Sequence, residues 1–546
     1  MSIRWRHALL GLLLSAAAGP SFGDDLAELR QLRDSTISLI NALVEQGVLT
    51  REKADAIIAQ AQKAGATASA ANTPSTATTG SATAPSAGPP LAPGTVRVPY
   101  VPETVKREIT DEIRQDVAAQ AKAERWGEPG AFPDWLRRFD WYGDLRLRYE
   151  VDQFPPGNAP VAILQSSGVN INNSTETDER LRFRARFGFN TTVSDAVTVG
   201  IRLASGGVGT GSNPGSENQT IGSYETRATV GFDRAFIAYH PLTWLEASAG
   251  IVGMPYFEPT SLVWADDVSL GGVVLRFFPQ LTPTLKWFTT AGAYPILQVD
   301  PTPTNSASSK WLYAYQSGVE WKFTDSISWQ SAAALYDYRH IEGTPNPTIY
   351  STAYSNTAAP FRQTGNTVFD IDGLLNTQNG TQNYLWGLAS KFHILNLSSA
   401  LDLRFVGPTH VILTGDWVKN LGFDEREIEQ RTGYRIDRQI EGWQSRITVG
   451  YPTMQPKYAW QAYVGYRSVQ RDATVDAFTD QDFHLGGTDA KGYFLGARFS
   501  FEKNTFVNLR YFSAEPINGV ELAGATSSGV LPLKINVTQL DIMSGF

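Results

Sequence analysis

Residues 180–189 read RLRFRARFGF, in which four arginines alternate with Leu181, Phe183, Ala185 and Phe187. Side chains of a β-strand point alternately to its two faces, so one face carries guanidinium groups about 7 Å apart and the other is apolar. Unpaired arginines are unfavourable in a protein core, and each would cost about 2–4 kcal/mol if it faced lipid near the bilayer midplane. A wall between lipid and a water-filled lumen suits both faces. The stretch therefore predicts a strand of a transmembrane β-barrel.

The same two-residue period recurs along the chain from about Trp135, for example in 145–151 and 493–499. Short turns alternate with long connections, of which 340–383 is the longest. Outer-membrane barrels have an even number of strands, with short turns on the periplasmic rim and long loops outside. Counting up and down predicts an all-β transmembrane barrel of about sixteen antiparallel strands. The segment 384–405 reads either as one long strand or as a loop element followed by a strand.

The two ends of the sequence agree with export to the outer membrane. Residues 1–23 resemble a secretory leader, because arginines precede a short apolar run and the small Ser21 and Gly23 suit cleavage before Asp24. The alternating segment at the other end closes on the aromatic Phe546, as the last strand of bacterial outer-membrane barrels does. We therefore expect the mature chain in the bacterial outer membrane.

Between the leader and the barrel, composition predicts three further segments. Residues 24–64 have the apolar spacing of a helical hairpin or a short coiled coil, and 65–97 are Ala, Thr, Ser, Gly and Pro with little charge or bulk. Residues 98–134 begin with a charged helix that carries a narrow apolar stripe. The predicted organisation is thus a periplasmic α-helical region, a flexible linker and a helical lead-in to a barrel over 135–546.

Composition also limits the chemistry. The 546 residues carry a formal charge of -8 and include no cysteine, so disulfides, thiolate catalysis and cysteine metal sites are excluded. The net charge and the lack of a basic patch argue against nucleic-acid binding. The six histidines are scattered, and no metal-ligand spacing or phosphate-binding loop is present. We expect no catalytic residue, no metal and no cofactor, although spacing alone does not exclude a barrel enzyme with a nucleophile–His pair.

Several stretches resemble the bacterial "putative porin" family of outer-membrane proteins. They are VPYVPETVKREITDEIRQDV at 98–117, GMPYFEPTSLVWADDVSLGG at 253–272, TGDWVKN at 414–420 and, most specifically, DFHLGGTDAKGYFLGARF at 482–499. The resemblance covers Val98 to Phe546 and extends more distantly to sixteen-stranded phosphate-selective porins. It implies a passive channel, assembled as a homotrimer, without naming a solute.

The phase of the alternation predicts which arginines face the lumen. The predicted pore-lining residues are Arg146, Arg148, Arg180, Arg182, Arg184, Arg186, Arg202, Arg404, Arg446, Arg467, Arg498 and Arg510. A column of guanidinium groups favours carboxylate and phosphate groups, which it can bind in a bidentate manner. The other interpretation is a structural ladder that acids on neighbouring strands or on an inserted loop neutralise. Both can hold in one lumen.

The connection 254–268 is the candidate constriction. In sixteen-stranded porins the third extracellular loop, at this place in the chain, folds inward, so the resemblance implies the same here. Its candidate residues are Tyr256, Glu258, Asp266 and Asp267, whose carboxylates would oppose the arginine column across the narrowest point. A surface loop with capping acids is the alternative.

The sequence therefore predicts an outer-membrane porin that lets small hydrophilic solutes diffuse passively, with a modest preference for anions. Its predicted surroundings are outer-membrane lipid and two identical subunits. A second hypothesis is structural, because residues 24–64 could bind peptidoglycan or a periplasmic partner and 65–97 could act as the tether. Deleting residues 24–97 would separate the two hypotheses, since a pure porin keeps its conductance and a tether loses envelope integrity.

Overall fold

The computed structural model describes residues 138–546 except 167–168, 223, 225, 349–350, 374–376, 379–380, 383 and 519–530. The predictions for 1–23, 24–64, 65–97 and 98–134 lie outside the described residues. Within them, α-helix is confined to α4 (Val161–Ser166) and α5 (Glu425–Thr432), beside the 3-10 turns η2 (Ser355–Thr357) and η3 (Asp476–Phe478). No helix in these described ranges is long and apolar enough to cross a membrane.

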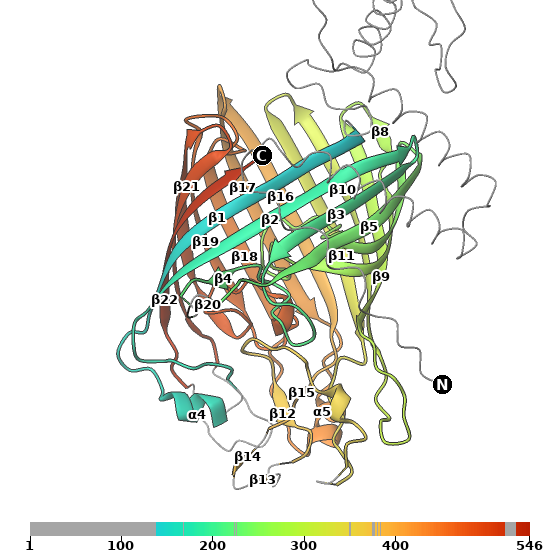
Figure 1. Ribbon diagram of the computed structural model, residues 1–546, viewed down its shortest axis with the longest axis vertical. Coiled ribbons are helices and arrows are strands. Elements are labelled where there is room, and N and C mark those ends of the chain that lie inside the picture. Colours follow the sequence, from blue (N-terminus) through green and yellow to red (C-terminus); the bar gives the residue numbers. More distant parts are fainter. Residues whose placement is uncertain are drawn as a thin grey trace, which may run out of the picture. The chain divides into compact units, whose positions relative to one another are not determined.

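One antiparallel sheet of eighteen strands closes on itself, as Figure 1 shows. Two of these strands, β4 (Gln219–Thr220) and β8 (Gln280–Thr282), are short pieces beside longer neighbours, so sixteen strands make the wall in the described part of the chain. The wall strands are β1 (Phe139–Gln153), β2 (Asp178–Ser194), β3 (Val197–Ser205), β5 (Val230–Leu242), β6 (Leu245–Gly253), β7 (Ser269–Phe277), β9 (Leu285–Leu297), β10 (Lys310–Thr324), β11 (Ile327–Arg339), β16 (His393–Val406), β17 (Thr409–Asn420), β18 (Glu441–Gly450), β19 (Trp460–Val469), β20 (Ala490–Glu502), β21 (Thr505–Pro516) and β22 (Ile535–Gly545). The predicted fold class is confirmed.

The barrel closes where β1 pairs with β22, from Asp144 opposite Gly545 to Gln153 opposite Asn536. The Phe546 amide then donates to the Gly143 carbonyl at 3.1 Å. A Cβ on Gly143 would lie 2.7 Å from Cζ of Phe546, so the terminal ring occupies the space above this glycine. The aromatic end of the sequence therefore covers one end of the seam.

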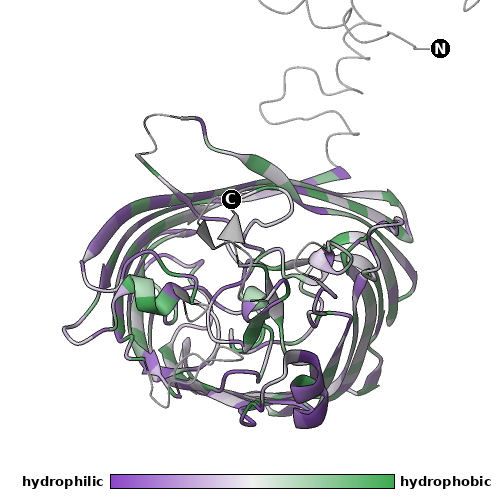
Figure 2. Cartoon of the chain, turned by 90° about the horizontal axis from the view of Figure 1, so that it is seen from below, coloured by the Kyte–Doolittle hydropathy of each residue, from purple (hydrophilic) through white to green (hydrophobic). Residues whose placement is uncertain are grey.

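Short turns and long connections lie on opposite rims of the barrel (Figure 1). By the usual arrangement of outer-membrane barrels, the short-turn rim is periplasmic and the long connections are extracellular. The longest connection holds β12 (Val368–Asp370), β13 (Thr377–Gln378), β14 (Thr381–Gln382) and β15 (Trp386–Leu388). Because β15 is separate from β16, the reading of 384–405 as a loop element followed by a strand is the right one. Seen from the long-connection rim in Figure 2, several segments fold into the ring of strands.

The two faces of the wall differ as the alternation predicts. Leu181 and Phe187 are 56% and 49% exposed on the outside, whereas Arg184 between them is 5% exposed. Trp141 and Phe187 stack outside with their ring centroids 5.5 Å apart. An apolar, aromatic exterior matches a surface that meets lipid.

Part of the lumen is filled by a hydrophobic core. The connection 254–268 contributes Leu262 and Trp264, and the inner faces of β10 and β11 contribute Leu312 and Tyr336, all of them buried. The parts of these strands that carry Leu312 and Tyr336 are apolar on both faces, because one face meets lipid and the other meets the inserted loop. The remaining inner wall, from β18 through β22 to β3, carries most of the lumen arginines and faces the cavity described next.

Candidate functional site

The connection 254–268 lies inside the barrel and is anchored by aromatic side chains. The Trp264 ring packs edge-on against Tyr336 at 5.3 Å between centroids. The Tyr256 hydroxyl lies 2.9 Å from the Tyr294 hydroxyl on β9. Tyr256, predicted as a constriction residue, is thus buried among wall tyrosines and serves as an anchor of the loop.

The other side of this connection reaches the arginine-bearing wall. Asp267 accepts a hydrogen bond from Arg184 on β2 at 2.7 Å. On β19, Arg467 donates to the Ser261 hydroxyl at 2.9 Å, and on β18 Arg446 donates to a main-chain carbonyl of the loop at 3.1 Å. The loop therefore spans the lumen from its apolar side to the arginine wall.

The middle of the 180–186 column is neutralised by acids from three elements. Arg184 lies 2.9 Å from Asp144 on β1 and 2.7 Å from Asp267 on the inserted loop. Arg186 lies 2.6 Å from the same Asp144 and 3.4 Å from Glu217, which belongs to the connection after β3. Arg184 and Arg186 therefore hold the inserted loop and the connection after β3 against the wall, besides contributing positive charge to the lumen.

Arg148 forms the most enclosed of these clusters. Its side chain is 0% exposed and lies 2.7 Å from Asp541 on β22, 2.9 Å from Asp482 and 3.4 Å from Glu150. Arg510 on β21 also contacts Asp482 at 3.0 Å and Asp541 at 3.4 Å. The cluster ties the β1–β22 seam to the connection that follows β19.

Three further arginines, Arg180, Arg182 and Arg202, are also paired with acids. Arg180 and Arg182 both contact Glu150, at 2.9 and 3.0 Å. Arg202 on β3 donates through Nε to Asp233 on β5 at 2.9 Å. Much of the predicted column is therefore a ladder of ion pairs.

Three arginines differ, because within the described residues no acid lies within 4.0 Å of Arg146, Arg446 or Arg498. Together with Arg184, Arg467 and Arg510 they line a cavity of about 320 Å³. Arg446 and Arg498 lie 5.8 and 5.6 Å from the Tyr463 ring. Arg404 lies apart from this cavity, since its Nε donates to the Gly407 carbonyl in a short turn at the periplasmic rim.

The loop side of the cavity supplies carboxyl groups. Glu258 and Asp266 line it opposite the arginines, and Asp266 is exposed. Burial, with the nearby carboxylates of Asp266 and Asp416, raises the pKa of Glu258 well above its usual value. Glu258 therefore resists ionisation, whereas the exposed Asp266 and the arginines of the wall line the same cavity.

Some residues of the site were missed in the sequence. Asp480 and Asp482 line the same cavity from the connection after β19, and nothing in their spacing indicated that it folds inward. Arg234 faces the lumen because β5 has a register shift opposite Arg202 and Leu203, which breaks the two-residue phase. Across the described residues, no group of three His, Asp or Glu side chains could hold a metal ion.

Solved structures of similar architecture include three outer-membrane proteins. DcaP of Acinetobacter baumannii is 13% identical, with 75% of this chain and 97% of that chain covered and a TM-score of 0.38. OprB of Pseudomonas putida is 10% identical over 76% and 96%, with a TM-score of 0.43, and OmpF of Salmonella typhi in complex with daunomycin is 12% identical over 75% and 97%, with a TM-score of 0.37. None is close enough to indicate a solute for this chain.

No curated protein is similar to the chain in sequence. A protein-family model described as "putative porin", however, matches residues 33–546, which is nearly the whole chain. Together with the closed barrel and its apolar exterior, this match places the protein in the bacterial outer membrane as a channel. The chain belongs to the putative porin family.

Proposed function

We propose that the channel lets small hydrophilic solutes diffuse passively across the outer membrane and favours anions at the constriction. The observation that carries the proposal is the wall of Arg146, Arg446 and Arg498, which lines the cavity beside the inserted loop and has no acid within 4.0 Å in the described part of the chain. Guanidinium groups that face water attract carboxylate and phosphate groups and can bind them through two parallel hydrogen bonds.

The preference should be modest rather than strict. The other arginines of the cavity are balanced by Asp267, Asp480 and Asp482, so only part of the formal positive charge acts on a passing ion. The excess cations lie on the barrel wall, and the exposed Asp266 lies on the loop. This separation produces a field across the passage, which orients dipolar solutes as well as selecting their charge.

We also propose that the channel is a homotrimer in outer-membrane lipid, the assembly that the family resemblance implies. Chemical cross-linking of the purified channel in detergent would give a three-subunit band if this assembly is right.

Planar-bilayer recording under a tenfold potassium chloride gradient tests the charge preference. A perfectly selective channel for a monovalent ion would reverse at about 59 mV. We expect the wild-type potential to have the anion-selective sign with a smaller size, and the double variant Arg446→Gln/Arg498→Gln to lie closer to zero. Arg404→Gln at the rim is the matched control and should leave the potential unchanged. A cation-selective wild type, or a double variant that behaves like wild type, would overturn the proposal.

A further inference from the structure

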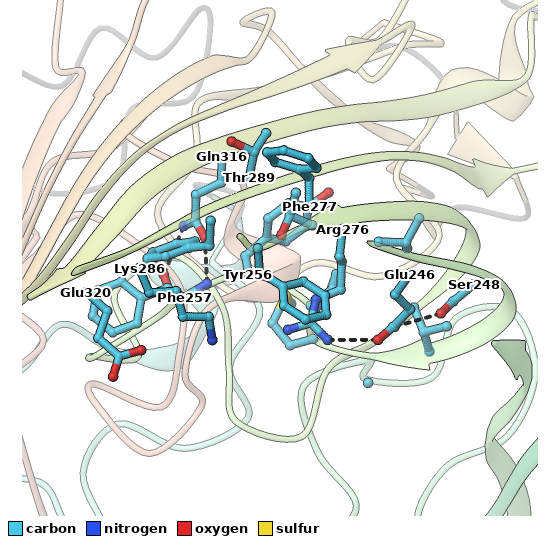
Figure 3. A pocket seen from close by; sticks show the side chains of 18 of the residues that line it. Glu246, Ser248, Tyr256, Phe257, Arg276, Phe277, Lys286, Thr289, Gln316 and Glu320 are labelled. Atoms are coloured by element: carbon cyan, nitrogen blue, oxygen red, sulfur yellow. Dashed lines mark hydrogen bonds and ion pairs between the residues drawn. The ribbon is translucent and has the colours of Figure 1, made fainter. Parts of the chain in front are cut away.

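A second cavity of about 430 Å³ lies on the periplasmic side of the segment that leads into the inserted loop. Its wall comes from the inner faces of β5 to β11, and Figure 3 shows it from close by. The Gln316 side chain accepts from the Phe257 amide at 2.7 Å and donates to the Phe257 carbonyl at 3.0 Å, which fixes the roof. Arg276 and Lys286 each lie one residue from the periplasmic end of their strand, so the cavity is a place that a solute meets after the constriction.

Two phenylalanine rings of this cavity lie along the wall. Phe288 is directly opposite Gly318, and a Cβ on Gly318 would lie 2.5 Å from Cζ of the ring. Phe236 is directly opposite Gly200, where a Cβ would lie 2.4 Å from Cε1. Each ring therefore fills the space above a glycine and turns an aromatic surface to the cavity. Phe257 from the roof meets Phe288 at 6.2 Å between centroids.

Cationic groups accompany these rings. Arg276 is paired with Glu246 at 3.5 Å. Within the described ranges, Arg234 and Lys286 have no carboxylate within 4.0 Å. Glu320 is opposite Lys286 in the register of β9 and β10 but forms no ion pair with it there. Two uncommitted cations against one uncommitted acid give the cavity a positive balance.

The polar side chains that could recognise a sugar are largely engaged within the protein. Both the amide oxygen and the amide nitrogen of Gln316 are hydrogen-bonded to the Phe257 main chain. The Ser248 hydroxyl donates to Glu246 at 2.9 Å, and the Thr289 hydroxyl lies 3.0 Å from that of Ser317. What the cavity leaves available is chiefly aromatic surface and cationic charge, beside Glu320, Thr290 and Gln330.

We propose that this cavity is a binding site for aromatic carboxylates, a planar ring with an attached anionic group. The ring packs on Phe288, and the carboxylate meets Lys286, which lies two residues away on the same face of β9. The inference rests on the proposed function, since it names the class of anion that the channel holds longest. An apolar anion without a flat ring would meet the same charge but lose the ring-on-ring contact.

Current block in planar bilayers tests the proposal with benzoate and cyclohexanecarboxylate, which have the same charge and similar size. Added from the periplasmic side, benzoate should block at a concentration about twofold to tenfold lower than cyclohexanecarboxylate. Phe288→Leu keeps an apolar side chain over Gly318 and should abolish this difference, whereas Lys286→Gln should weaken both blockers. The matched control is Phe499→Leu, because Phe499 is 45% exposed on the outside of the barrel and should not affect the block.

Gel mobility before and after heating shows that each variant forms the barrel. Equal block by the two anions in an anion-selective wild type would overturn the aromatic site and leave the proposed function intact. A difference that survives Phe288→Leu would also overturn it. Loss of anion selectivity, by contrast, concerns the arginine cavity and is read from the reversal potential in chloride alone.

Discussion

Removal of the Arg148 side chain tests whether the ion-pair ladder holds the fold together. Arg148→Met keeps a long side chain but leaves Asp541, Asp482 and Glu150 without a guanidinium that now lies 2.7, 2.9 and 3.4 Å away. Breaking a buried ion pair costs about 3–5 kcal/mol, because the remaining charge stays buried without its partner. Arg510 still reaches two of the three acids, so we expect the lower end, about 3 kcal/mol or roughly a hundredfold in the folding equilibrium.

Urea titration of the protein in lipid vesicles, followed by tryptophan fluorescence, measures this free energy of unfolding. Arg276→Met is the matched control, since Arg276 pairs with Glu246 at 3.5 Å with 43% of its side chain exposed. Such an exposed pair contributes about 0–1 kcal/mol. Equal losses in the two variants, or an unchanged Arg148→Met, would refute the idea that the ladder is structural.

The same variant should change how stability depends on pH. Burial alone would raise the pKa of the Asp482 carboxyl, but Arg148 and Arg510 hold it well below its usual value. A carboxyl with a lowered folded-state pKa stabilises the protein above its unfolded pKa, here 3.8, and loses that contribution as pH falls further. The difference between wild type and Arg148→Met should therefore be largest near neutral pH and narrow below about pH 4. A difference that does not change with pH would contradict this explanation.

Two further outcomes concern the inserted loop. Because the pKa of Glu258 is raised, its carboxyl ionises only at a pH well above the usual range, so the anion preference should fall as pH rises. Glu258→Gln should remove this part of the pH dependence of the reversal potential. An identical pH profile in the variant would contradict the assignment. Trp264→Ala removes a side chain that is 1% exposed, which costs the packing of the loop about 3–5 kcal/mol, so single-channel conductance should rise and fluctuate while the heat-modifiable barrel persists. The control is Trp443→Ala, since Trp443 is 45% exposed on the outside, and it should leave conductance unchanged. A wild-type conductance in Trp264→Ala would show that other contacts hold the loop.

The alternation of the sequence was sufficient to predict the barrel strands, but not the connections that fold into the lumen. The stretch 180–189 fixes its own two faces, because the side-chain period of a strand is local. The acids that neutralise it are not local: Asp267 and Glu217 come from connections whose inward folding depends on the rest of the barrel. The part of β10 around Leu312 and Ala314 is apolar on both faces, and no pattern within it indicates that a loop will cover Leu312. Arg234 was missed for a related reason, since a bulge shifts the phase without altering composition.

The division of the lumen into an apolar side and an arginine side separates two properties of a pore. The width of the passage depends on how far Trp264 and its neighbours push the loop from β10 and β11, and none of those contacts involves a charge. The ionic preference depends on arginines of the opposite wall. Substitutions in the aromatic packing could therefore enlarge or shrink the largest solute admitted while leaving the discrimination between cation and anion intact. Two related channels could therefore differ in size exclusion limit through one set of residues and in charge selectivity through another.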